Sequence, residues 1–255
     1  MPAAPFSARG RVDAVVVDNV EPITASDDVG HARCIDQFDA NPKIMANCAS
    51  GLAALVCGPG GYVGAVLVSD LRHFLDMPDD VPGPARRLAV QLGAIVRAGS
   101  ARPVGSGAPS GVGCTRRPGR RPCNGFVMVF RHANGEISWA CDVCEDDGVI
   151  TGWEGSPSDL SELDDSYVDG ESIEVVMPRE LFDRVRGVLL LDAASEVLVA
   201  RAQGCAAGVV LAGAAGAFEE LVGYVASEAN AATNRRRARL LDEACAALEA
   251  ALDEV

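Results

Sequence analysis

Lysine is nearly missing from this chain of 255 residues, which has Lys43 alone against 21 arginines. Histidine is also scarce, at three residues, and aromatic residues make up only 5% of the sequence. The bias towards arginine, with abundant Ala, Gly, Val and Asp, is typical of the codon usage of a GC-rich bacterial genome and carries no functional information. Because aromatics are few, a core must be built from Val, Leu and Ala. The composition, 49% hydrophobic and 23% charged, suits a globular protein.

Several motifs that would identify an enzyme are missing. The sequence shows no Ser-His-Asp set, no phosphate-binding loop and no dinucleotide fingerprint. One apolar stretch, residues 52–68, approaches the length of a membrane span, but Gly58-Pro59-Gly60-Gly61 interrupts it and no basic cluster flanks it. We therefore expect no membrane association, no signal peptide and a cytoplasmic location, and the sequence favours a binding protein over an enzyme.

Four cysteines form the most informative pattern. Cys141 and Cys144 make a CxxC turn, and Cys114 and Cys123 lie upstream with eight residues between them. Zn²⁺ in structural sites prefers four such ligands in a tetrahedron, commonly from two facing loops. The residues between the pairs alternate as strands around a turn at Ala133-Asn134-Gly135, which predicts a β-hairpin. The pattern favours a zinc-ribbon-like site with Zn²⁺ as the cofactor.

Other interpretations of these cysteines compete with zinc. Disulfides would need an oxidising compartment, for which the sequence gives no export signal. A redox CxxC normally lies where a strand enters a helix, whereas this one lies between two predicted strands. Four unrelated core thiols are the remaining alternative. No residue is singled out as catalytic or as a ligand of an organic cofactor.

Charge changes sign abruptly along the chain, although the net charge of −14 opposes general affinity for nucleic acid. Residues 100–135 contain six arginines and no acid, and residues 141–175 contain twelve acids and no base. Four of the arginines lie between Cys114 and Cys123: Arg116, Arg117, Arg120 and Arg121. The acidic segment could neutralise these arginines within the protein. Alternatively, a bound metal could fix the loop that carries them, and they could then bind a phosphate or a carboxylate of a partner.

The remaining patterns predict an α+β fold, in which a zinc-ribbon-like β-hairpin module joins a C-terminal βααβαα segment ending in a helical hairpin. Residues 1–61 lack periodicity and are predicted to be a disordered tail or an extension ahead of a true start near Tyr62. Residues 62–113 should form a strand, helices and a linker, residues 114–155 the ribbon, residues 156–172 an acidic linker and residues 173–255 the C-terminal segment. In the last helix, Arg235, Arg236 and Arg237 fill the first turn, where the helix dipole favours acids.

Four stretches resemble a group of functionally uncharacterised bacterial proteins of actinobacterial type: YVGAVLVSDLRHFLDMPDD, CTRRPGRRPC, ISWACDVCEDDGVITGWEGSPSDLS and YVASEANAATNRRRARLLDEACAALE. The resemblance runs from about Tyr62 onward and implies a four-cysteine core, but it brings no activity with it. This chain departs from the usual zinc knuckle at Glu145, where glycine commonly follows the CxxC because the backbone turns with positive φ.

Three functional hypotheses follow. The first is a zinc-stabilised binding protein that contacts nucleic acid or another anionic partner through the arginine-rich loop. The second is a regulatory module that binds a protein partner through its acidic segment. The third is an enzyme that uses carboxylates near the metal loop, for which Asp146, Asp147 and Glu154 are the candidates.

Overall fold

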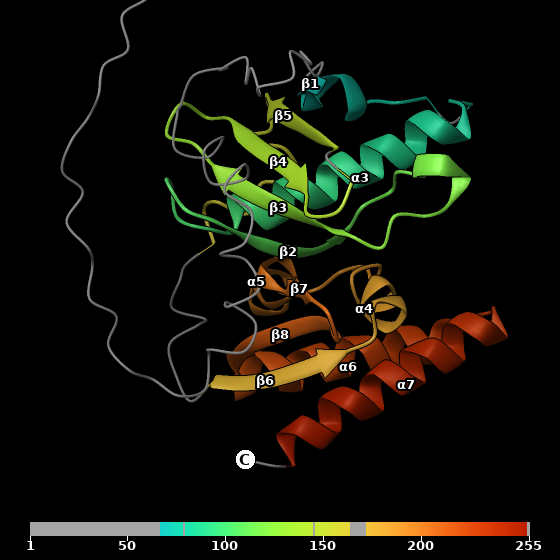
Figure 1. The fold of residues 1–255 in the computed structure, drawn as a ribbon. Coiled ribbons are helices and arrows are strands. Elements are labelled where there is room, and N and C mark those ends of the chain that lie inside the picture. The colour runs from blue at the N-terminus through green and yellow to red at the C-terminus, as the bar shows by residue number, and fades with distance from the viewer. Residues whose placement is uncertain (1–66, 79, 145, 164–171, 254–255) are drawn as a thin grey trace, which may run out of the picture. The chain divides into compact units, whose positions relative to one another are not determined.

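The computed structural model describes residues 67–253, apart from residues 79, 145 and 164–171. The expectations for residues 1–61, for Glu145 and for most of the acidic linker fall outside the described residues. Within them the chain has an α+β fold with two sheets and five α-helices, which agrees with the predicted fold class at that level (Figure 1).

The first half of the described chain forms a five-stranded sheet. Its strands, in spatial order, are β1 (Leu67–Asp70), β5 (Asp147–Thr151), β4 (Ile137–Cys141), β3 (Phe126–Arg131) and β2 (Gly107–Gly113). The β1–β5 pair is parallel and the other pairs are antiparallel. Short 3₁₀ turns occur at η1 (Leu71–Phe74) and η2 (Pro118–Arg120).

Helix α3 (Gly83–Ser100) covers one face of this sheet (Figure 1). Its apolar stripe, with Leu92, Ile95 and Val96 fully buried, packs against side chains that alternate along the strands. The strand residues of this core are Val112, Val127, Val129, Ile137, Trp139 and Ile150. The predicted ribbon strands therefore share one sheet and one core with β1, β2 and α3.

The second half is built on a three-stranded antiparallel sheet in the order β6 (Ser172–Met177), β8 (Gly208–Ala214) and β7 (Gln203–Cys205). Its helices are α4 (Arg179–Val185), α5 (Ala193–Arg201), α6 (Ala215–Ala231) and α7 (Arg235–Leu252). The predicted helical hairpin is present as α6 and α7, whose buried stripes include Leu221 and Leu248. The order is βααββαα, because the short strand β7 was not predicted.

The two halves meet along β2. The backbone N–H of Gly111 donates to the carbonyl of Ala202, just ahead of β7, at 2.7 Å. Phe126 of β3 belongs to the core of the second half, where Gly204 lies directly against its ring. Residues 107–113 were expected to be part of a linker, yet they form β2, the edge strand along which the two halves meet. Their small side chains allow the close approach, since a Cβ on Gly111 would lie 2.7 Å from the ring of Phe182.

The described start of the acidic linker, residues 156–163, packs against the body. Leu160 is buried with Ala101 and Ala200, and its backbone N–H donates to the Ser100 hydroxyl. Among the helices of the described ranges, none is both long enough and apolar enough to cross a bilayer.

Candidate metal centre

The structure brings Cys114, Cys123, Cys141 and Cys144, here called the cysteine cluster, together from two connections at one end of the five-stranded sheet. Cys114 follows β2 and Cys123 precedes β3, so both lie on the connection between these strands. Cys141 ends β4, and Cys144 lies in the turn before β5. Strand pairing holds the two connections side by side, because Val127 and Cys141 are cross-strand partners.

Sulfur spacing in the cysteine cluster suits a tetrahedral metal site. All four Sγ atoms lie within 4.8 Å of one another. The Sγ–Sγ separation is 3.5 Å for Cys114 and Cys144 and 3.7 Å for Cys123 and Cys141. A Zn–S bond of about 2.3 Å gives a tetrahedron with edges of about 3.8 Å, whereas a disulfide brings two sulfurs to about 2.05 Å. The cysteines of the described residues are all free thiols.

Backbone N–H groups point at three of the four sulfurs. Arg116, Gly125 and Val143 each donate to the Sγ of the cysteine two residues earlier, at 3.4 Å in every case. A donor aimed at sulfur stabilises the thiolate more than the thiol, and the thiolate is the form that binds metal. The turns that follow these cysteines are therefore arranged to hold negatively charged sulfur.

In the absence of a cation, burial opposes the charged form of two of these thiols. Burial raises the pKa of the Cys114 thiol to about 12, and burial also raises the pKa of Cys141. Burial acts in the same direction on Cys123, but N–H and thiol donors outweigh it and lower the pKa of that group. A divalent cation would remove this conflict, because it stabilises thiolates directly. The arrangement can therefore hold a soft or borderline metal ion and would release protons on binding it.

A surrounding layer fixes the two cysteine connections. The Asp142 carboxylate accepts from the backbone N–H of Phe126 at 2.8 Å, and the N–H of Asp142 donates to the Phe126 carbonyl at 3.1 Å. Arg179, the first residue of α4, donates to the carbonyls of Cys114 and Gly125 at 3.2 and 3.4 Å. Gly125 must be glycine here, since a Cβ would lie 2.6 Å from the Cys141 sulfur.

The residues between Cys114 and Cys123 form an exposed extension of the β2–β3 hairpin, here called the arginine loop (Thr115–Pro122). The N–H of Cys114 donates to Gly125 O, and the N–H of Cys123 donates to Arg116 O, so the ladder continues to a tight turn at Pro118–Arg121. Gly119 and Arg120 both have positive φ in that turn, at 58° and 66°. Arg120 is unusual there, because residues with a Cβ rarely adopt this conformation.

Only one of the four arginines of the loop forms an ion pair with an acidic residue that the structure describes. Arg116 Nε lies 3.2 Å from an Asp146 carboxylate oxygen, although the Arg116 side chain remains 67% exposed. Within the described part of the chain, Arg117, Arg120 and Arg121 make no ion pair. Three cations at the tip of the loop are therefore presented to solvent.

One of the three carboxylates considered for an enzyme lies far from the cysteine cluster. Burial raises the pKa of Asp146 and of Asp147, and their mutual repulsion adds to the rise at Asp147. Glu154 lies instead beside Gly135 in the β3–β4 turn, at the opposite end of the sheet from the cysteines. The expectation that all three lie near the metal loop is thus wrong for Glu154.

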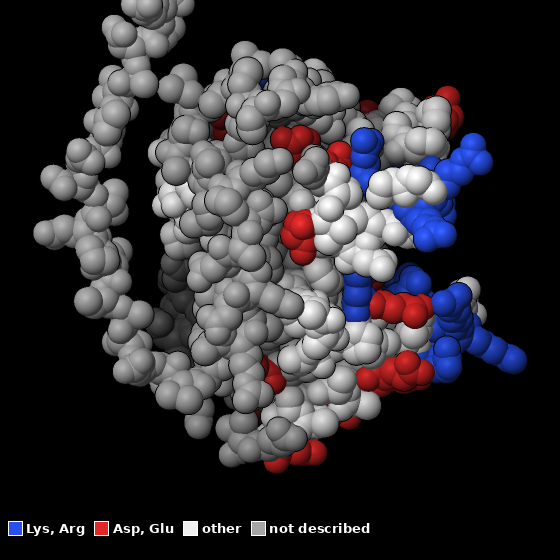
Figure 2. All heavy atoms as spheres, in the orientation of Figure 1, with Lys and Arg blue, Asp and Glu red and all other residues white. Residues whose placement is uncertain are grey.

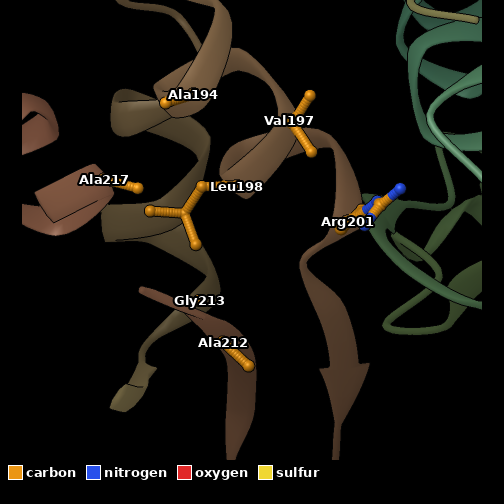
Figure 3. Close-up of a pocket in the computed structure, with 7 residues that line it drawn as sticks. All are labelled: Ala194, Val197, Leu198, Arg201, Ala212, Gly213 and Ala217. Atoms are coloured by element: carbon orange, nitrogen blue, oxygen red, sulfur yellow. The ribbon is translucent and has the colours of Figure 1, made fainter. Parts of the chain in front are cut away.

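Small cavities lie in both halves of the described chain. One of about 110 Å³ lies beside the cysteine cluster and is lined in part by Gln91, Arg116, Trp139 and Asp146. Another holds only about 10 Å³, the space of a single water, between α5, β8 and α6 (Figure 3). Arg201 lines its edge, but its Nε donates to Ala101 O in the first half.

The chain matches no protein-family model, no curated protein and no solved structure. The residues themselves must therefore support any functional argument.

Sequence reasoning found the four cysteines but missed the residues around them. Asp142 stands inside the CxxC, where its polar side chain could have suggested a backbone contact. Arg179 is 65 residues from Cys114, whose carbonyl it binds, and no local pattern marks it. No local pattern marks Gly125 either, because a side chain is excluded there by Cys141 on the neighbouring strand.

Proposed function

We propose that this protein is a zinc-stabilised binding protein that contacts an anionic partner through the arginine loop. The carrying observation is that the four sulfurs form one cluster at the base of an exposed loop, of whose four arginines three make no ion pair with a described residue. One Zn²⁺ on Cys114, Cys123, Cys141 and Cys144 would complete a zinc-ribbon-like site in which all four ligands are sulfur. Such a closed shell suits a structural ion better than a catalytic one, which keeps an open position.

A metal ion at the base of the loop would reduce the entropy cost of binding. Thr115–Pro122 makes few contacts with the body, and the loop is held at its ends by the hydrogen bonds of Cys114 and Cys123. Fixing those ends with a metal limits the conformations that the arginines must lose when they bind. Arginine is suited to the task because its planar guanidinium forms paired hydrogen bonds with phosphate or carboxylate oxygens.

Elemental analysis of the purified protein tests the proposal that the cysteine cluster binds zinc. We expect about one zinc per chain, and Cys141→Ser should lower that content while Cys245→Ser, a cysteine of α7, should leave it unchanged. Folded protein that carries four free thiols and takes up no zinc would contradict the assignment.

The binding half is tested by charge reversal. Replacing Arg116, Arg117, Arg120 and Arg121 with Glu should abolish binding to labelled duplex DNA, duplex RNA or poly-aspartate, whichever the wild type binds. Zinc content should stay at the wild-type level, because the side chains of these residues are not ligands. If the same change releases zinc or unfolds the protein, the arginines are structural counter-ions and the binding proposal is wrong.

A further inference from the structure

A second group of exposed arginines begins α7. Its first turn holds Arg235, Arg236 and Arg237 and no acid, and the Asn234 side chain caps it by accepting from the N–H of Arg237 at 3.0 Å. Arg237 is used internally, because it donates to Glu228 at 2.6 Å and to Gly187 O at 3.4 Å. Arg235 and Arg236, here called the α7 arginines, are exposed. Arg235 makes no ion pair in the ranges that the structure describes.

Neighbouring residues of α4 connect the α7 arginines to the cysteine cluster. Arg179 donates to the carbonyl of Cys114 at the base of the arginine loop, and the next residue, Glu180, accepts from Arg236 at 2.7 Å. The first turn of α4 therefore contacts both the base of the arginine loop and one of the α7 arginines. Figure 2 shows basic side chains gathered on the side of the molecule where Figure 1 places the bright green η2 turn and the N-terminal end of α7.

The surface around these arginines restricts the kind of ligand. The arginines of both groups are exposed, and neither cavity described above is lined by residues of both groups, so a ligand that touches both groups binds at the surface. A polymer with regularly spaced charges can offer a separate anionic group to each of the two elements at once. Neither Thr115–Pro122 nor Asn234–Arg239 contains an aromatic residue, and unpaired bases are usually bound by stacking on aromatic rings.

We propose that the arginine loop and the α7 arginines bind one double-stranded nucleic acid together, through its phosphate backbone and without reading its sequence. This proposal rests on the proposed function and adds the partner class and a second contact surface. A duplex carries phosphates at regular intervals along both strands, so one molecule can offer phosphates to both groups. The ion pair of Arg236 with Glu180 does not prevent this contact, because both side chains are more than half exposed and an exposed pair exchanges readily.

Salt dependence measures the number of phosphate contacts. Each phosphate neutralised by an arginine adds about 0.9 to the slope of log affinity against log salt concentration on a DNA duplex. Five arginines, three from the loop tip and two from α7, predict a slope of up to about −4.5. The strongly acidic remainder of the chain gives no long-range attraction, so binding should be detected best at low salt.

The experiment is fluorescence anisotropy with a short labelled DNA duplex over about 50–200 mM salt. In the full-length protein, Arg235→Gln with Arg236→Gln should weaken binding and reduce the slope by about 1.8, since two contacts are lost. Arg72→Gln controls for the loss of one positive charge outside the proposed surface, half the change in net charge of the double variant. Arg72 is an exposed residue of η1, which follows β1 at the end of the sheet away from the cysteine cluster. The Arg72→Gln variant should keep the wild-type slope of log affinity against log salt concentration.

The outcomes separate the two proposals. If the wild type binds no anionic probe, or if charge reversal in the arginine loop has no effect, the proposed function is wrong. If the loop arginines are required but the α7 double variant keeps the wild-type slope, the second contact is wrong and the proposed function stands. Equal binding to poly-aspartate or to a single strand of the same length would overturn the duplex as the partner. Zinc content and melting temperature, measured for every variant, identify any loss that comes from misfolding.

Discussion

Gly125→Ala tests the geometry of the cysteine cluster without touching a ligand. A Cβ at this position would lie 2.4 Å from the Asp142 carboxylate, 2.6 Å from the Cys141 sulfur and 2.9 Å from the Val143 Cβ. The backbone cannot simply move away, because the N–H of Gly125 donates to Cys123 Sγ and its carbonyl accepts from Cys114. The added methyl must therefore displace Cys141 or Asp142 from the arrangement that the metal needs.

Inserting a methyl group into a packed site typically costs about 1–3 kcal/mol. If that strain falls on the metal-bound state, zinc affinity should drop roughly 5- to 140-fold, at about 1.4 kcal/mol per factor of ten. The assay is competition for zinc against a chromogenic chelator, with a thermal melt of the zinc-loaded protein beside it. Gly223→Ala is the matched control. It lies exposed inside α6 with no atom near its added Cβ, and it should stabilise the protein by about 0.5–1 kcal/mol. Wild-type zinc affinity in Gly125→Ala would refute the packing described around Cys141.

Two further predictions concern the second half of the protein. In Gly204→Ala, the added Cβ would lie 2.1 Å from the Phe126 ring, which should cost about 1–3 kcal/mol of folding free energy. The melting temperature should therefore fall by about 2–12 °C. An unchanged melting temperature would contradict the contact between β3 and β7. Asn234→Ala should cost about 1 kcal/mol through loss of the α7 cap, measured by urea denaturation, whereas Asn230→Ala, inside α6, should cost less; equal effects would argue against the cap.

Local patterns predicted the elements whose stability is local. The stripe of α6, with Phe218, Leu221 and Val225, repeats at helical spacing, and all three side chains are fully buried. Asn234, of a residue type that commonly caps helices, accepts from the backbone N–H of Arg237 at the start of α7. The cysteines could be grouped because few residue types bind zinc and their spacing is restricted.

The missed elements depend on contacts that are distant in sequence. Strand β2 reads Gly-Ala-Pro-Ser-Gly-Val-Gly, a composition that is poor for a strand, and it forms because β3 pairs with it and Phe182 fills the space over Gly111. The parallel pairing of β1 with β5 joins residues about 80 positions apart, which no short window reveals. For the same reason, the sequence predicted a separate ribbon where the structure has one five-stranded sheet.

The placement of Phe126 has a consequence for the order in which the protein can assemble during synthesis. Its strand lies in the first sheet, while its side chain is covered by the core that includes Met177, Phe182 and Val209. A ribosome exposes β3 well before it has made that cover, so the nascent first half carries an unshielded aromatic ring beside two of its thiols. The four residues of the cysteine cluster all precede residue 145, so they could bind a metal ion before the second half is made. Early metal binding would let the first half fold locally. It would also hold Phe126 in position until the later strands are synthesised.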